Sequence, residues 1–317
     1  MKSSSRPSSS RPSPDRRVER RAAGRAAPER AAPGPVAPGA SAPGPAAGLV
    51  DAHVHVFPPE MIRDREAYLD RDARFGALHR SPKAPMATAD QVLAHMDETG
   101  VDVSILVGFG FADQGLCSMV NDYVIEATAA HPGRLAGLAC VAPDAPGAVA
   151  ELERCLGAGL RGCGELAPES NSPGLDALAD CLVEQGSVLL VHSNEPLGHR
   201  YPGKGSYTPE ACFALAEAHP GLSLVFAHMG GGLFLYELMP EVREALADVY
   251  YDTAAVPYLY GNEVYDVAVA CAGSEKLLFA TDYPLLSPTR YTEGLSRLAP
   301  VDRAAVANGN ARRVFRL

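Results

Sequence analysis

Eight short apolar segments alternate with amphipathic stretches from residue 48 onward, and this alternation constrains the fold more than any other feature. The segments are continuously apolar, which is typical of parallel strands covered on both faces. Eight such units in about 270 residues match the size of a (β/α)8 TIM barrel, and a doubly wound open sheet is the structural alternative. The predicted strands are Gly48–Val56, Val101–Gly108, Leu135–Val141, Gly159–Leu166, Val188–His192, Leu222–His228, Val249–Thr253 and Leu277–Thr281.

Helical periodicity fills the gaps between these strands. In Ala89–Thr99, for example, Val92, Leu93 and Met96 recur on one helical face. Pro-Gly pairs after two of the predicted helices are typical helix stops. The other predicted helices are Asn121–His131, Pro146–Gly157, Leu175–Gln185, Pro209–His219, Leu233–Ala247, Asn262–Cys271 and Arg290–Leu298.

Residues 1–47 differ from the rest of the chain in composition. Ser, Arg, Pro, Ala and Gly dominate there, and Leu, Ile, Phe and Tyr are absent. Such a segment buries too little apolar surface to offset the entropy lost on ordering. We therefore predict a disordered tail at 1–47 and one barrel domain at 48–317. No apolar stretch follows the paired arginines of the tail, which disfavours a targeting signal, and a start codon assigned too far upstream is the alternative explanation.

Deleting residues 1–47 is expected to leave folding and activity nearly unchanged, because the segment has nothing with which to join a core. Thermal unfolding and kcat/KM of the shortened chain measure this. Aggregation of the shortened chain, or a loss of more than about tenfold in kcat/KM, equivalent to about 1.4 kcal/mol, contradicts the prediction.

Charge and cysteine content narrow the class of protein. Residues 1–47 carry a charge of +6 and the whole chain −10, which leaves −16 on residues 48–317. A body this acidic is a poor candidate for binding nucleic acid. No run of about 18 apolar residues occurs, so we expect no membrane-spanning helix. The seven cysteines lie in apolar runs without CxxC spacing, which favours buried free thiols in a reducing compartment and hence a cytoplasmic protein.

Polar residues gather at the carboxyl ends of five predicted strands, where a barrel places its catalytic groups. At the end of the first strand, His53 and His55 share one face and can hold one metal ion. Each strand-end residue alone is as compatible with a core or turn role, but burying four imidazoles and two carboxylates together is costly without a cation. The set therefore predicts a divalent metal site. Its other members are Glu165, His192, His228 and Asp282.

Three phrases, at Val50–His55, Phe226–Gly231 and Phe279–Pro284, resemble motifs of the amidohydrolase superfamily. They are similar to the branch called amidohydrolase-related or amidohydrolase 2, which also contains the aminocarboxymuconate-semialdehyde decarboxylase-like enzymes. The ending Asn308–Phe315 resembles the last helix of that branch. The resemblance covers roughly residues 48–317 and implies a (β/α)8 barrel that holds one or two divalent ions, with zinc expected first and manganese as the alternative.

The fourth strand departs from the common patterns of that superfamily. Many binuclear members carry a carboxylated lysine there, whereas this chain has Glu165. A Gly-Glu pair on strand four is similar to the TatD-like metal hydrolases, in which the glutamate bridges two metals. The alternative is that Glu165 only orients a ligand histidine.

The resemblance implies a metal-dependent hydrolase that uses activated water to cleave an amide, lactone or ester. In that reaction Asp282 accepts the proton of the water and His228 polarises the substrate. A metal-dependent decarboxylase or hydratase, acting on a carboxylated aromatic or enoic acid, uses the same groups and remains open. A non-catalytic metal-binding barrel is disfavoured because the ligand set is complete.

The loop after the fifth strand is long, rich in Gly and Pro, and carries several polar side chains. It is expected to bind a small, carboxylated substrate, and a solvated loop is the alternative. A homodimer is the default assembly for such a barrel. His79, His95, His131 and His219 are expected to be non-catalytic. The predicted substrate-binding residues are Glu195, Arg200, Tyr201 and Lys204, together with His199.

Overall fold

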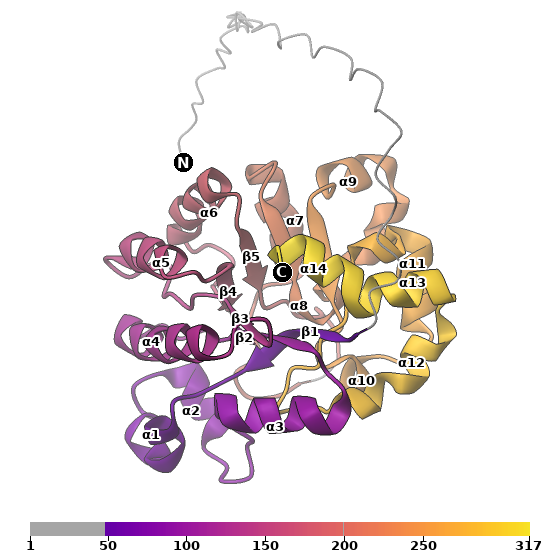
Figure 1. Ribbon diagram of the computed structural model, residues 1–317. Coiled ribbons are helices and arrows are strands. Elements are labelled where there is room, and N and C mark those ends of the chain that lie inside the picture. Colours follow the sequence, from indigo (N-terminus) through magenta and orange to yellow (C-terminus); the bar gives the residue numbers. More distant parts are fainter. Residues whose placement is uncertain (1–47, 199) are drawn as a thin grey trace, which may run out of the picture. The chain divides into compact units, whose positions relative to one another are not determined.

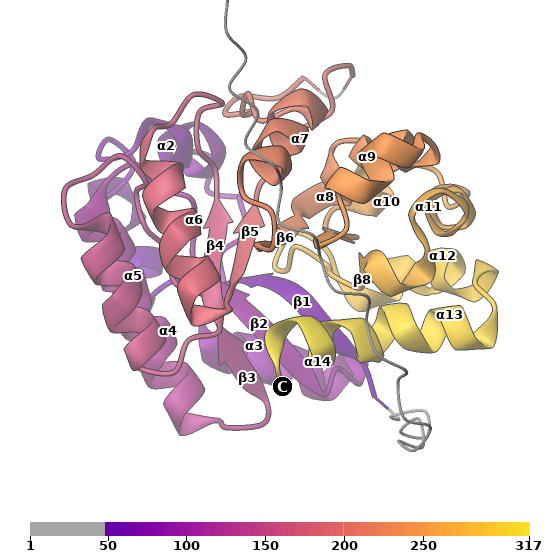
Figure 2. The same ribbon diagram turned by 90° about the horizontal axis from the view of Figure 1, so that it is seen from above.

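The computed structural model describes residues 48–198 and 200–317, so the predictions for the tail and for His199 lie outside the described residues. Parallel strands stand at the centre and helices surround them (Figures 1 and 2). The strands form one ladder from β1 to β3 and a second from β4 to β8. They are β1 (Val50–His55), β2 (Val103–Val107), β3 (Leu135–Gly137), β4 (Gly162–Leu166), β5 (Val188–Val191), β6 (Ser223–Phe226), β7 (Val249–Asp252) and β8 (Leu277–Leu278).

Backbone hydrogen bonds join the two ladders at both edges. The Ala139 N–H donates to the Gly162 carbonyl at 2.8 Å, which links the segment after β3 to β4. The His55 N–H donates to the Tyr283 carbonyl at 2.7 Å, which links β1 to the segment after β8. The sheet is therefore closed, and the predicted (β/α)8 barrel is confirmed over the doubly wound alternative.

Strand β8 is shorter than predicted, because the chain beyond Leu278 no longer pairs with the backbone of β7. The Ala280 N–H instead donates to the Thr253 hydroxyl at 2.9 Å. On the other side, the Ala52 N–H of β1 donates to the Phe279 carbonyl at 2.9 Å. The segment after β8 therefore stays beside β1 and delivers Asp282 to the carboxyl end of the barrel.

The helix predicted at Ala89–Thr99 is α3, with the same bounds. Thr88 and Gln91 form a capping box at its start, and Gly100 ends it in the left-handed region. The prediction of a single helix over Leu233–Ala247 is wrong. The segment forms a 3₁₀ turn (Leu233–Leu238) and then a separate helix that begins at Pro240, because proline has no N–H to continue the preceding helix. The helices are α1 (Pro59–Arg63), α2 (Ala73–His79), α3, α4 (Gln114–Ala130), α5 (Ala148–Gly157), α6 (Gly174–Gln185), α7 (Pro209–Ala218), α8 (Ala227–Gly230), α9 (Pro240–Ala245), α10 (Val256–Leu259), α11 (Val264–Ala272), α12 (Thr292–Arg297), α13 (Pro300–Ala304) and α14 (Asn310–Phe315), with 3₁₀ turns η1 (Arg65–Ala67), η2 (Leu233–Leu238), η3 (Ser274–Lys276) and η4 (Pro288–Tyr291) and the π-helical η5 (Ala305–Gly309).

Two apolar cores hold the barrel together. The inner core fills the barrel with small and branched side chains such as Val50, Ile105 and Leu190. Helix α14 belongs to this core through Val314 and Phe315 and lies across one end of the barrel (Figure 2). The outer core packs the helices against the strands. All seven cysteines are buried and free, as the sequence predicts. The inner core leaves the carboxyl ends of the strands for polar side chains.

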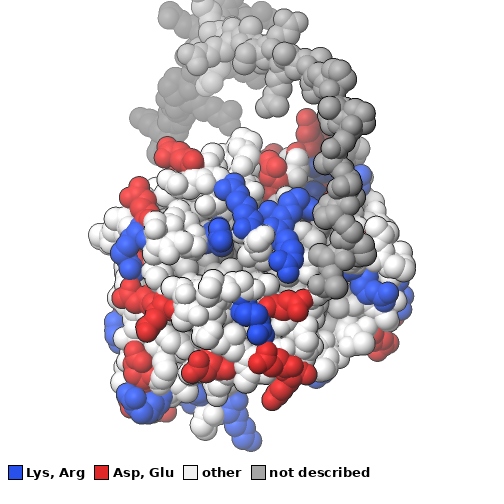
Figure 3. Space-filling model, viewed as in Figure 1, with Lys and Arg blue, Asp and Glu red and all other residues white. Residues whose placement is uncertain are grey.

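Acidic and basic side chains are interspersed on the face shown in Figure 3. A group of basic side chains lies near α14, with acidic side chains around it. Within the described residues, no helix is both long and apolar enough to span a membrane.

Candidate metal centre and active site

A β-bulge in β1 points both predicted histidines into the barrel. Asp51 pairs with Ser104 and Val54 with Leu106, so β1 has one residue more than β2 between these pairs. Ala52 consequently packs in the inner core and Val54 in the outer core, while His53 and His55 both face inward. Bulges commonly re-aim side chains beside active sites.

Strand β4 contains a matching irregularity. Cys163 pairs with Leu189 and Leu166 with Val191, again with one extra residue on the bulged strand. Cys163 and Leu166 both pack in the outer core. Glu165 between them points inward and is 4% exposed. The two bulges thus bring the carboxylate from β4 and the imidazoles from β1 to the same end of the barrel.

His192 directly follows β5, and His228 lies two residues after the end of β6. Residue His228 lies in α8 with φ 58°, a left-handed conformation that a non-glycine residue rarely adopts. The Asp252 carboxylate stabilises this turn by accepting a hydrogen bond from the His228 N–H at 2.8 Å. Asp282 is also left-handed, with φ 63°, and its N–H donates to the His53 carbonyl at 3.1 Å.

Each of the four imidazoles has an acceptor behind it, which fixes one ring nitrogen as a donor and turns the other toward the centre. His53 Nδ1 donates to Asp252 Oδ2 at 2.9 Å and His55 Nδ1 to the Gly108 carbonyl at 2.9 Å. His228 Nδ1 donates to the Ala254 carbonyl at 3.0 Å. His192 has the opposite orientation, with Nε2 donating to Asn194 Oδ1 at 3.2 Å.

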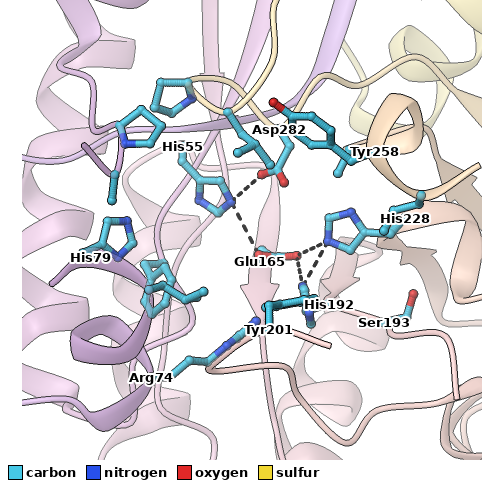
Figure 4. A pocket seen from close by; sticks show the side chains of 18 of the residues that line it. His55, Arg74, His79, Glu165, His192, Ser193, Tyr201, His228, Tyr258 and Asp282 are labelled. Carbon is cyan, nitrogen blue, oxygen red and sulfur yellow. Dashed lines mark hydrogen bonds and ion pairs between the residues drawn. The ribbon is translucent and has the colours of Figure 1, made fainter. Parts of the chain in front are cut away.

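The inward nitrogens form two close pairs, and Figure 4 shows the pair made by His192 and His228. His53 Nε2 lies 3.2 Å from His55 Nε2, and His192 Nδ1 lies 3.0 Å from His228 Nε2. Two imidazole lone pairs at such distances repel unless a proton or a cation lies between or beside them. The geometry therefore provides two places where positive charge is required.

Carboxylates complete both pairs and define two ligand groups, His53–His55–Asp282 and Glu165–His192–His228. Asp282 Oδ1 lies 3.1 Å from His55 Nε2. Glu165 contacts both groups, because Oε1 lies 2.9 Å from His192 Nδ1 and Oε2 lies 3.5 Å from His55 Nε2. All six predicted ligands thus lie together, and the donor set of imidazole nitrogens and carboxylate oxygens fits a divalent cation.

The electrostatics of the cluster favour added positive charge. Burial alone would lower the pKa of His53 and His228, but the carboxylates around them outweigh it. The charges of Glu165 and Asp252 raise the pKa of His53 to about 10. The hydrogen bond to Glu165 and the charge of Asp282 raise the pKa of His228 to about 9. A site that holds protons this strongly also favours a metal cation.

The pKa values of His192 and Asp282 are lowered instead of raised. Burial lowers the pKa of His192 to about 4, so this ring is neutral, as a ligand must be. Burial opposes ionisation of Asp282, but its hydrogen bond to His55 and the nearby imidazoles lower its pKa to about 2. Asp282 is therefore ionised, as a carboxylate ligand must be.

Asp252, at the end of β7, is a functional candidate that the sequence analysis missed. It is fully buried, and its carboxylate accepts hydrogen bonds from His53 Nδ1, from the His228 N–H and from the Ala254 N–H. One side chain thus orients a histidine of each ligand group. The position of Asp252 at the end of a predicted strand could have identified it from the sequence, but a lone aspartate at such a position is equally typical of a turn.

Replacing Asp252 with asparagine is expected to weaken metal binding by about 10- to 100-fold while the barrel stays folded, because an amide orients His53 and His228 less well than a carboxylate. Metal titration of the purified variant measures this, with circular dichroism as the check on folding. Asp248→Asn, a change at an exposed position four residues earlier, is the matched control. Equal metal affinity in Asp252→Asn and wild type contradicts the assignment.

One cavity of about 370 Å³ opens onto the ligand groups. Glu195 and Tyr201, two of the predicted substrate-binding residues, line it. Lys204 lies outside its wall, with Nζ 4.0 Å from Glu195 Oε2. Arg200 is exposed and does not line it. The remaining lining residues are largely apolar and include Phe57, Leu78, Phe109, Leu259, Pro284 and Leu285.

The segment between β1 and α3 supplies two further lining residues that the sequence analysis did not assign to the site. Arg74 and His79 both lie on α2 and line the cavity (Figure 4). Burial lowers the pKa of His79 to about 4, and its ring stacks on Phe75 with 4.4 Å between centroids. His79 is therefore a neutral wall residue. The length of the segment between β1 and α3 could have indicated from the sequence that it contributes to the site, because long insertions in compact domains are often functional.

A closed barrel with histidines and carboxylates at the carboxyl ends of its strands defines the class of metal-dependent barrel enzymes. The family model described as amidohydrolase matches residues 50–317. This chain therefore belongs to the amidohydrolase family. A comparison with curated proteins finds no match.

Solved structures of similar fold include decarboxylases and a hydrolase. The 5-carboxyvanillate decarboxylase of Sphingomonas paucimobilis is 19% identical, with a TM-score of 0.70, and the match covers 86% of this chain and 100% of that chain. A dihydroxybenzoic acid decarboxylase of Polaromonas with bound manganese is 18% identical, with a TM-score of 0.65, covering 85% and 97%. A probable 2-pyrone-4,6-dicarboxylic acid hydrolase of Acinetobacter baumannii is 17% identical, with a TM-score of 0.58, covering 85% and 100%. At these identities the likeness shows the fold.

Proposed function

We propose that this protein is a metal-dependent hydrolase that cleaves a C–N or C–O bond of a small substrate carrying one carboxylate. The observation that carries the proposal is the position of Glu165, whose two carboxylate oxygens face different ligand groups. A carboxylate so placed is suited to bridging two divalent ions, and a pair of ions is a common arrangement for hydrolysis.

The two ligand groups would each hold one ion, with Glu165 shared between them. Histidine and carboxylate ligands suit both zinc and manganese, and zinc is the first expectation. When bound, such a cation lowers the pKa of its water toward about 7 and polarises a substrate carbonyl. Side chains of the protein would take up the proton and bind the substrate.

Asp282 would take up the proton of the attacking water. Its carboxylate is ionised and lies beside His55 in the wall of the cavity. His228, on the opposite side of the cluster in Figure 4, has only Nε2 facing the cluster, and this nitrogen would bind the second ion; with a single ion bound it would instead polarise the carbonyl group that is attacked. General-base catalysis of this kind contributes about 10²- to 10⁴-fold to the rate.

Arg74 would bind the carboxylate of the substrate. Its Nε donates to the Gly203 carbonyl at 3.3 Å, and its guanidinium lies 5.4 Å from the centroid of the Phe109 ring. Its buried Nη1 has no hydrogen-bond partner among the described residues. A buried cationic donor without a partner is unfavourable, and a substrate carboxylate would satisfy it.

Arg74→Gln is expected to raise KM for a carboxylated substrate by about 10- to 100-fold without loss of metal, because a charged hydrogen bond to the substrate is removed. Steady-state kinetics and metal analysis test this together. Arg71→Gln is the matched control, because Arg71 is exposed and pairs with Asp113 away from the cavity. A KM that changes equally in both variants contradicts the role of Arg74.

Decarboxylation of an aromatic acid is the second candidate function. The apolar cavity favours it, because an aromatic ring would be desolvated there beside the cluster. The names of two structural neighbours also point to decarboxylation of aromatic acids.

The two functions differ in the source of the atoms in the product. Metal-loaded protein would be incubated in H2¹⁸O with carboxylated lactones, esters and amides, and separately with aromatic acids. Hydrolysis is expected to place one ¹⁸O in the product and to release no CO2. Release of CO2, with a solvent proton at the vacated carbon, would overturn the hydrolase proposal in favour of the decarboxylase.

A further inference from the structure

Buried side chains hold the segment that carries Asp282, because the pairing of β8 with β7 ends at Leu278. The Thr253 hydroxyl accepts a hydrogen bond from the Ala280 N–H and donates one to the Ala280 carbonyl, each at 2.9 Å. Both peptide groups of Ala280 thus bond to a side chain where a strand would bond to backbone. The position of the chain just before Asp282 therefore depends on individual side chains.

Thr281, the residue directly before Asp282, is held in the same way. Asp51 Oδ1 accepts a hydrogen bond from the Thr281 N–H at 3.0 Å, and the Tyr291 hydroxyl donates to the Thr281 carbonyl at 2.9 Å. Thr281, Asp51 and Tyr291 are all buried. Water does not reach these groups, so the loss of one partner leaves the other without a hydrogen bond.

The hydroxyl of Thr281 closes a turn around Asp282. It donates to Asp51 Oδ2 at 2.5 Å and accepts from the Tyr283 N–H, two residues further on, at 3.0 Å. Threonine hydroxyls commonly stabilise turns by bonding a nearby backbone N–H. Asp282, between these two contacts, has the left-handed φ of 63° that a non-glycine residue rarely adopts. The hydroxyl therefore fixes the backbone on both sides of Asp282 in this conformation.

The same network reaches a second residue of the ligand group His53–His55–Asp282. Asp51 Oδ1 also accepts from the His53 N–H at 3.3 Å, and the Asp282 N–H donates to the His53 carbonyl at 3.1 Å. Thr281 itself lines no cavity and is not among the ligands. Its effect on a metal would therefore pass through the direction of the Asp282 carboxylate, whose Oδ1 lies 3.1 Å from His55 Nε2.

We propose that Thr281 is a positioning residue: its hydroxyl, held by Asp51, directs the Asp282 carboxylate toward His53 and His55 and so sets the metal affinity of that ligand group. This inference rests on Asp282 as a metal ligand, which is part of the proposed function. It does not depend on whether the reaction is hydrolysis or decarboxylation.

The test compares Thr281→Val, which removes the hydroxyl at nearly constant side-chain size, with Thr281→Ser, which keeps it. Titration of the full chain with Co²⁺ measures metal affinity, and the visible absorption bands of the bound ion report its ligand geometry. Thr281→Val is expected to bind Co²⁺ about 10- to 100-fold more weakly, with shifted bands, because Asp282 is less well oriented. Thr281→Ser is expected to stay within about threefold of the wild type and to keep its bands.

Val249→Ala is the control for a purely structural effect, because it truncates a buried side chain at the amino end of β7. It is expected to lower thermal stability and to leave Co²⁺ affinity and absorption unchanged. Tyr291→Phe is a second and milder variant, which removes only the hydrogen bond to the Thr281 carbonyl. It is expected to weaken Co²⁺ binding about three- to tenfold, and it carries the test if Thr281→Val does not fold.

Wild-type affinity and bands in folded Thr281→Val overturn the inference and leave the metal centre intact. The same result in Tyr291→Phe overturns it if Thr281→Val does not fold. Equal weakening in Thr281→Val and Val249→Ala, at equal loss of thermal stability, also overturns it, because the effect would then follow stability alone. A wild-type chain that binds no Co²⁺ removes the metal centre, and with it both the proposed function and this inference.

Discussion

Alanine in place of His53 or His55 is expected to remove the bound metal and to abolish activity, a loss on the order of 10⁴-fold or more, or about 5.4 kcal/mol of transition-state stabilisation. The two inward Nε2 atoms lie 3.2 Å apart and supply half of the predicted imidazole ligands. No neighbouring side chain of the described residues replaces them in the group that contains Asp282.

The barrel itself should remain folded in both variants. Its stability comes from the packed inner and outer cores, whereas these histidines lie at the carboxyl face. Metal analysis, circular dichroism and turnover measure the three consequences. His219→Ala is the control, because its ring bonds Asp176 on the helical exterior. Turnover at the wild-type rate in either variant, with no metal bound, would refute the assignment.

Glu165→Gln is expected to lower the metal content from about two ions per chain to about one and to reduce the rate steeply. In the wild type, Oε1 faces His192 and His228 while Oε2 faces His53 and His55. A neutral amide is a poor bridge between two cations. The four imidazoles add no negative charge as ligands, so two cations depend on Glu165 and Asp282 for neutralisation.

The alternative for Glu165 is an orienting role without contact to the metal. The wild type would then hold one ion, and Glu165→Gln would keep it with a loss of about 10- to 100-fold in affinity or activity. Metal counting at matched purity separates the two cases. Glu169→Gln, an exposed change four residues later, is the control. A wild-type count of one under metal-replete conditions excludes the bridge.

The barrel and its six candidate ligands could be predicted because each depends on local sequence. Continuous apolar runs such as Val188–Val191 indicate buried parallel strands. Such strands in a barrel all point their carboxyl ends to one face, so polar residues at those ends must meet. The strands and the shared position of their carboxyl ends can both be predicted without information on which side chains contact each other.

The direction in which the six ligand side chains point depends on contacts that local sequence does not encode. The bulges in β1 and β4 shift the inward face by one residue, and the spacing of His53 and His55 looks the same with or without them. Asp252 acts through hydrogen bonds to residues from other strands. Arg74 reaches the cavity only because the segment between β1 and α3 folds over the carboxyl face.

The cluster at the carboxyl end of the barrel is expected to bind divalent metal through the six candidate ligands. A crystal structure of the metal-loaded protein, with the ions located by anomalous scattering, measures this. We expect two ions about 3.5–4 Å apart. One should lie about 2.0–2.2 Å from Nε2 of His53 and His55. An anomalous map without a peak at this cluster, or with ions bound only elsewhere, would show that these residues do not form a metal site.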